Sequence, residues 1–322
     1  MSDPSARAVH KNMIRAKFRN STWAEATERF FLALLGSKLN FKQRHRLRAD
    51  ILTEKDQYER DAAIFNKYIS QFDVPRLDKF YWYHVVDLGN GVVTPGDYDY
   101  RSSIDVFGFP GDMRGMRVLD VGSATGFFAF EFERRGADVY SVELPSLLDW
   151  DMIAGERDAL VRSLMDYHGV STLEDAFWCH LDGPFQFCHH RLNSSVKRIF
   201  STVYELRPAL FGGHSFDLIF VGDLLLHLFS PLQALNAVAL LCRHKLVVAS
   251  EVIQLPGADA PLIYFIDSRK TDARSWWSFT RSSLEQMLLR VGFRNVVDAG
   301  RYSGVNRRTG SRCDRLVLHA LK

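Results

Sequence analysis

The stretch that decides the fold is Arg117-Val-Leu-Asp-Val-Gly-Ser-Ala-Thr-Gly-Phe-Phe128. Its first residues suit a buried strand, which runs into Asp120. Gly122 and Gly126 then stand four positions apart, and apolar helix formers follow. Because glycine has no Cβ, such a strand–turn–helix lets a ligand approach the backbone closely. The acid ends the strand at the carboxyl edge of a sheet, where open α/β sheets bind ligands. The stretch therefore predicts a ligand-binding loop in an α/β fold.

Downstream of this loop, short apolar runs alternate with amphipathic segments. Alternation of this kind predicts a doubly wound parallel sheet. The expected fold class is α/β: a Rossmann-like seven-stranded mixed sheet flanked by helices, with a helical N-terminal appendage. The expected strands cover 117–121, 138–142, 196–200, 216–221, 245–250, 295–299 and 315–321; the expected helices cover 127–135, 151–166, 185–192, 231–241 and 281–291, the last capped by Ser282 or Ser283 and stopped by Gly292.

Residues 1–79 are expected to form a helical, basic N-terminal extension, and residues 80–322 the main domain. Up to Arg48 there are eleven basic and three acidic side chains, a balance of +8, so the remainder must carry −5 to give the total of +3. Two interpretations stay open. The arm binds a polyanion such as RNA, or it is a solvated helical face or a partner-binding extension.

Residues 76–116 are expected to lead into the core. Aromatic and β-branched content over 80–86 predicts a strand, and Asn90-Gly91 predicts a hairpin turn within 88–96. A short helix is expected over 101–105, and the glycines and proline of 107–115 indicate a linker. Residues 169–182 fit no clear pattern.

Composition narrows the class of protein. The four cysteines form no C-x-x-C pair, and no apolar run reaches the ~20 residues that span a bilayer. We therefore expect a cytoplasmic protein with no membrane partner. The tandem His189-His190 with Cys188 and His180 suggests a metal site, but ligands on one helix face lie three or four positions apart. We expect no metal.

The glycine loop also narrows the ligand. A dinucleotide loop reads G-x-G-x-x-G, whereas Ala124 stands where a middle glycine often lies. Glu143 follows Asp120 by 143 − 120 = 23 residues, at the end of the next expected strand. An acid there accepts two hydrogen bonds from ribose hydroxyls. A nucleoside ligand without a pyrophosphate, such as S-adenosylmethionine, fits this pattern; an ordinary tight turn and a solvent-facing acid are the alternatives.

The motif Asp120-x-Gly122-x-x-x-Gly126 followed by Glu143 resembles class I S-adenosylmethionine-dependent methyltransferases. The resemblance covers roughly 80–322. Within that class, a subgroup resembling the tRNA wobble-uridine methyltransferase CmoB is suggested by Trp82-Tyr83-His84, Asn90–Gly96, Leu226-His227-Leu228, Trp276-Trp277 and Gly292-Phe293.

The resemblance implies roles for individual residues. Val203 would cover the adenine ring and Glu205 would accept from its amino group; a core valine and a surface acid are the alternatives. The implied cofactor-binding set is Asp120, Gly122, Ser123, Gly126, Glu143, Val203, Glu205 and Asp223.

The segment 222–227 would face the transferable methyl group. His227 suits a general base because the pKa of histidine lies near neutrality, and His84 is a second candidate. A structural histidine is the alternative for both. Trp276 and Trp277 would line an acceptor pocket or pack in the core.

The expected function is methyl transfer from S-adenosylmethionine to an oxygen or nitrogen of a small molecule or glycan-type metabolite. One alternative is a tRNA-modifying methyltransferase acting near a wobble uridine, which the basic arm would support. Another is a binding protein with the same fold and no catalysis.

Overall fold

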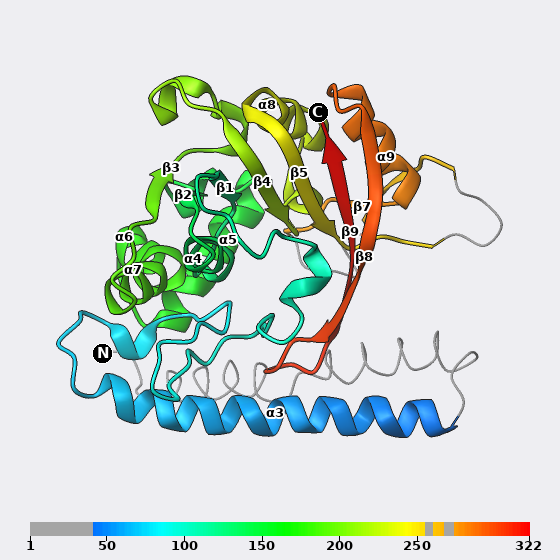
Figure 1. Cartoon of the computed structure of the whole chain (residues 1–322). Coiled ribbons are helices and arrows are strands. Elements are labelled where there is room, and N and C mark those ends of the chain that lie inside the picture. Colours follow the sequence, from blue (N-terminus) through cyan, green and yellow to red (C-terminus); the bar gives the residue numbers. More distant parts are fainter. Residues whose placement is uncertain (1–40, 255–259, 267–273) are drawn as a thin grey trace.

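The computed structural model describes residues 41–254, 260–266 and 274–322, and of residues 41–49 the backbone alone. Its centre is a seven-stranded sheet in the order β3-β2-β1-β4-β5-β9-β8 (Figure 1). Neighbours from β3 to β5 are parallel, whereas β9 is antiparallel to both β5 and β8. The strands are β1 (Arg117–Val121), β2 (Asp138–Glu143), β3 (Lys197–Phe200), β4 (Phe216–Gly222), β5 (Cys242–Ser250), β8 (Asn295–Val305) and β9 (Arg312–Leu321).

The expected α/β class and seven-stranded mixed sheet are confirmed. The central strands β1 and β4 are buried on both faces, as parallel strands between helix layers must be. One face packs against α4 (Phe127–Arg134) and α7 (Gly183–Arg191), and the other against α8 (Pro231–Leu241) and α9 (Arg281–Arg290). A third, smaller core lies between α5 (Ala154–His168) and α6 (Leu173–Phe177).

The expected strand over 80–86 is wrong. That segment is extended but joins no ladder: its backbone bonds irregularly to 94–98, for example from Val85 N to Tyr98 O at 2.9 Å. Its aromatic side chains serve packing instead, with the Trp82 ring 5.0 Å from that of Phe65. The Asn90-Gly91 turn is confirmed, because both residues have positive φ, 54° and 76°, as a type I′ turn requires.

Other local expectations need correction. The cap of α9 is Thr280, whose hydroxyl accepts from Ser283 N, rather than Ser282 or Ser283. A 3₁₀ turn over Ile104–Phe107 replaces the expected helix at 101–105. The unassigned residues 169–182 form α6 and a π-helical turn, Trp178–Asp182. A two-stranded sheet of β6 (Ile263–Phe265) and β7 (Trp277–Phe279) was not expected.

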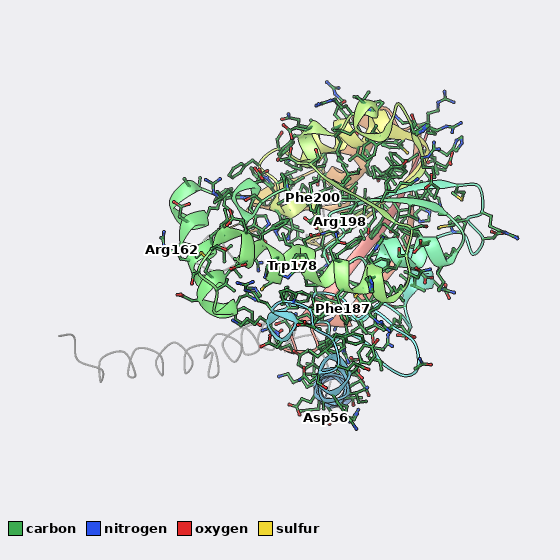
Figure 2. All side chains as sticks on the ribbon, turned by 90° about the vertical axis from the view of Figure 1, so that its left-hand side faces the viewer. Asp56, Arg162, Trp178, Phe187, Arg198 and Phe200 are labelled. Carbon is green, nitrogen blue, oxygen red and sulfur yellow. The ribbon has the colours of Figure 1, made fainter. Side chains whose placement is uncertain are left out.

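The N-terminal helix α3 (Phe41–Ile69) is present and packs on the main body. Phe65 is buried against Phe187 of α7, whereas exposed Asp56 lies on the outer side of α3 (Figure 2). Arg307, wholly buried at the end of the β8–β9 hairpin, forms an ion pair with Asp61. Most of the expected basic arm, 1–40, lies outside the described residues, and the division at residue 79 stays a prediction. No described helix combines the length and apolar content needed to cross a bilayer.

Candidate functional site

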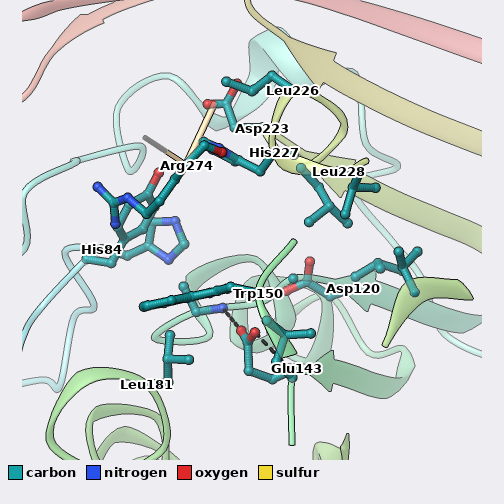
Figure 3. Close-up of a pocket in the computed structure, with 18 of the residues that line it drawn as sticks. His84, Asp120, Glu143, Trp150, Leu181, Asp223, Leu226, His227, Leu228 and Arg274 are labelled. Carbon is teal, nitrogen blue, oxygen red and sulfur yellow. Dashed lines mark hydrogen bonds between the residues drawn. The ribbon is translucent and has the colours of Figure 1, made fainter. Parts of the chain in front are cut away.

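A cavity of about 590 Å³ opens at the carboxyl ends of β1, β2 and β4. Seven of the ten predicted site residues line it. Figure 3 shows Asp120 and Glu143 on one side of this cavity, and His84, Asp223 and Arg274 on the other. The seven residues are His84, Asp120, Gly122, Glu143, Val203, Asp223 and His227.

The loop between β1 and α4 is held by side chains on both sides of Ala124. Ala124 has a φ of 47°, a left-handed conformation that costs a non-glycine residue roughly 1–2 kcal/mol. Glu143 Oε2 accepts from Ala124 N at 3.0 Å (dashed in Figure 3), and Arg198 Nη1 donates to Ala124 O at 3.4 Å. The loop is therefore preformed, and Glu143, whose two oxygens carry about four lone-pair sites, can still accept from a ligand.

Asp120 lies beneath this loop with an unsatisfied carboxylate. Its Oδ2 is buried without a hydrogen-bond partner, and burial raises the pKa of its carboxyl to about 7. A buried polar atom without a partner is costly, which indicates that a ligand completes the site. A ligand with a cationic amino group fits this carboxylate.

Ser123, Gly126 and Glu205 lie outside the cavity lining. Ser123 Oγ donates to Asp120 O at 3.1 Å, so it stabilises the loop from beneath. A Cβ on Gly126 would lie 2.7 Å from the rings of Phe130 and Phe185, so this glycine serves packing. Glu205 is exposed and accepts from Thr202 Oγ1 at 3.2 Å. Because these three residues lie outside the cavity lining, the structure gives no support to the cofactor contacts predicted for them.

At the end of β4, Asp223 occupies a strained backbone position with a φ of 47°. It forms an ion pair with Arg315, and its other oxygen, Oδ1, is buried and unpartnered. Glu251 Oε2 lies 3.8 Å from Arg315 Nη1. Sequence reasoning missed both Arg315 and Glu251, because each lies far along the chain from the loop motif.

His227 is oriented by a backbone carbonyl. Its Nδ1 lies 2.7 Å from Arg274 O, and because a carbonyl oxygen only accepts, Nδ1 carries the hydrogen. The basic nitrogen of the neutral ring is therefore Nε2, which can accept a proton as a general base does. Trp276 and Trp277 are outside the lining; they anchor this region by donating to Asp151 O and Leu228 O.

His84 differs from His227 in burial. Burial alone lowers the pKa of its imidazole to about 3, and Nδ1 has no partner. A ring with so low a pKa is neutral at pH 7 and a weak base. His84 therefore lines the cavity, but its burial makes it a poor general base.

The remaining wall comes from segments that sequence reasoning did not connect. Asp97 accepts from Tyr81 OH at 3.0 Å and from Arg308 Nε at 3.0 Å. His180, in the π-helical turn, stacks on the Tyr81 ring at 4.8 Å. No spacing in the sequence links these positions. Within the described part of the chain, no group of His, Cys, Asp and Glu side chains is arranged to hold a metal ion.

Comparison with known protein families gives a match over more than half of the chain. Residues 96–297 match the family described as a methyltransferase domain. No curated protein matches the chain.

Two solved structures illustrate what the chain is similar to. One is the 1,6-didemethyltoxoflavin-N1-methyltransferase of Burkholderia thailandensis, with 1,6-didemethyltoxoflavin and S-adenosylhomocysteine bound: 19% identity, 65% of this chain and 72% of that one covered, TM-score 0.41. The other is the magnesium protoporphyrin IX methyltransferase of Synechocystis PCC 6803 with S-adenosylhomocysteine: 13% identity, 97% and 99% covered, TM-score 0.42.

Proposed function

The chain belongs to the methyltransferase-domain family, and we therefore propose that it uses S-adenosylmethionine to methylate an oxygen or nitrogen atom of a small-molecule or glycan-type acceptor. The observation that carries the proposal is the corner between β1 and β2. There a buried, unpartnered Asp120 oxygen and the Glu143 carboxylate lie at the carboxyl ends of neighbouring strands. These groups suit a ligand with a cationic amino group and a ribose.

The residues of this corner have separate tasks. Asp120 would accept from the ligand's ammonium group, a charge-assisted hydrogen bond. Glu143 would accept from the ribose hydroxyls, and Val203, buried in the lining, would cover the adenine. S-adenosylmethionine supplies an activated methyl group when bound.

At the other end of the cavity the chain must align an acceptor and remove its proton. Alignment supplies most of the acceleration when the donor is already activated. His227 Nε2 would take the proton that a hydroxyl or amine loses, because its Nδ1 is held by Arg274 O. Asp223, with an unpartnered oxygen in the same cavity, would orient the acceptor rather than the donor.

Two alternatives stand beside this proposal. A CmoB-like, tRNA-modifying activity rests on the sequence motifs and on the basic arm, most of which lies outside the described residues. A binding protein without catalysis is disfavoured, because Asp120, Gly122, Glu143 and His227 all line one cavity.

Calorimetry tests the proposal directly. The chain should bind S-adenosylmethionine, and Gly122→Arg should abolish binding, because φ at Gly122 is +77° and the side chain would enter the loop. Gly111→Arg is the matched control, since Gly111 is exposed and a Cβ added there would meet no heavy atom within 4 Å. Absence of binding to the unaltered chain, or binding that survives Gly122→Arg with a native circular dichroism spectrum, would refute the assignment.

A further inference from the structure

The cavity wall is strongly acidic although the chain as a whole carries +3. Seven carboxyl groups line it against three guanidinium groups, and without the two that suit the cofactor five carboxyl groups still face three guanidinium groups. Arg308 is paired with Asp97, and Arg315 with Asp223. Beyond Asp120 and Glu143, which suit the cofactor, the carboxylates are Asp97, Asp149, Asp151, Asp223 and Glu251.

A second observation concerns two histidines that touch. His168 Nδ1 lies 2.7 Å from Lys79 O, and its Nε2 lies 3.3 Å from His180 Nδ1. The carbonyl of Lys79 can only accept, so His168 Nδ1 carries a hydrogen. In neutral His168 the Nε2 atom is then an acceptor, and His180 Nδ1 must donate to it. Neutral His180 therefore keeps its lone pair on Nε2.

Packing holds His180 in this orientation at the cavity wall. The Tyr81 ring is stacked on the imidazole with an interplanar angle of 7°, and Trp150 contacts it edge-on at 5.9 Å. His180 lies in the π-helical turn Trp178–Asp182, and such turns recur at functional sites. Tyr81 is itself fixed by its hydrogen bond to Asp97.

Carboxylate oxygens and imidazole lone pairs make the same demand on a ligand. They accept hydrogen bonds and favour positive or zero charge, whereas a like charge in the cavity would be repelled. We propose that the methyl acceptor is an uncharged or cationic small molecule rich in hydroxyl or amino hydrogens, one of which is donated to His180 Nε2. This proposal rests on the proposed methyl transfer and narrows its substrate class, excluding phosphorylated and carboxylated acceptors and nucleic acid.

Labelled transfer tests the substrate class. The full-length chain is incubated with a cell extract and S-adenosylmethionine carrying a ¹⁴C-methyl group, and the products are separated by acid precipitation and by anion and cation exchange at pH 7. Because the labelled donor is itself a cation, an incubation without the protein is subtracted, and the remaining label is expected in the unbound or cation-exchanged small molecules. Label retained on the anion exchanger, or precipitated with RNA, would overturn the proposal. Label nowhere, with cofactor binding intact, would instead contradict methyl transfer itself.

Nitrogen NMR of the histidine rings tests the tautomer of His180 without any catalytic turnover. In the unaltered chain, His168 and His180 should both appear as neutral Nδ1–H tautomers at pH 7. An Nε2–H tautomer or an imidazolium at His180 would overturn the proposal. In His168→Leu, which removes the acceptor of His180 Nδ1, the single His180 tautomer should give way to a mixture.

The labelled acceptor then allows a kinetic test of His180. In His180→Leu the KM for the labelled acceptor should rise about tenfold, because one buried hydrogen bond is lost. The affinity for the donor should stay unchanged. His180→Gln, which restores an acceptor atom, should recover most of the loss. His190→Gln is the matched control, because His190 is exposed on α7. An unchanged KM in His180→Leu would remove His180 from the acceptor site.

Discussion

The two sides of the cavity are built in different ways. Most of the donor corner comes from one continuous piece of chain, from Asp120 to Glu143. Within this piece, Glu143 Oε2 holds the backbone of the β1–α4 loop at Ala124 N. The acceptor wall is assembled from distant pieces, as in the pairing of Asp97 with Arg308, 211 positions apart. A local motif thus brings its own geometry, whereas the acceptor wall depends on how the whole chain packs.

The strongest test of this contrast lies on the acceptor side. His227→Ala should lower kcat by roughly 10²–10⁴, because it removes a general base, while donor affinity measured by calorimetry stays the same. His190→Ala serves as the control. A kcat unchanged across pH would remove His227 from catalysis and leave alignment as the main contribution of that wall.

A smaller effect is expected at the donor corner. Glu143→Ala should weaken S-adenosylmethionine binding about 10- to 100-fold, because a hydrogen bond to a charged group contributes about 1.5–3 kcal/mol. Glu205→Ala should leave the affinity unchanged, since Glu205 is exposed and outside the cavity. Calorimetry on both variants decides between them. Equal losses would mean that the adenine end reaches Glu205 and that the corner is wider than the structure indicates.

The pH dependence of donor binding should isolate Asp120. Its pKa is raised to about 7 by burial, so it is ionised above pH 7 and protonated below. Since the ammonium group of the donor needs the ionised form, affinity should fall below pH 7 by at most about tenfold per pH unit. Asp120→Asn should bind more weakly and lose this dependence. The same slope in the variant would assign the titration to another group.

The least change is expected in the stability of the loop. Ala124→Gly should relieve a positive φ that costs roughly 1–2 kcal/mol, against a glycine entropy cost of roughly 0.5–1 kcal/mol. A net gain of up to about 1.5 kcal/mol should raise Tm by a few degrees, which scanning calorimetry can measure. A lowered Tm would mean that the Cβ of Ala124 makes contacts worth more than the strain.

Residues within one strand–loop–helix unit were predicted well. β1 has the bounds predicted for it, and α8 begins and ends where its apolar pattern does. Seven of the ten candidate site residues reach the cavity. Ser123, which does not, lies in the predicted loop, but its side chain points beneath it. Spacing predicts which loop a residue belongs to, and the backbone conformation decides the direction of its side chain.

Predictions that depended on partners elsewhere in the chain were less accurate. The 80–86 segment has the composition of a strand, yet its aromatic rings pack on α3 and α7 and its backbone finds irregular partners at 94–98. The strands β6 and β7 went unnoticed because each is only three residues long. Short segments carry too few positions to show a period.

Local sequence was enough to predict the α/β fold, the seven-stranded sheet and the loop from Asp120 to Glu143, because hydrophobic period, glycine placement and strand-end acids act over a few residues. The chemistry of the acceptor wall became visible only in the folded chain. The tautomer of His180 depends on His168 and, through it, on a carbonyl oxygen 89 positions earlier in the chain at Lys79. The direction of these hydrogen bonds is set where distant segments meet, and no local sequence pattern encodes it.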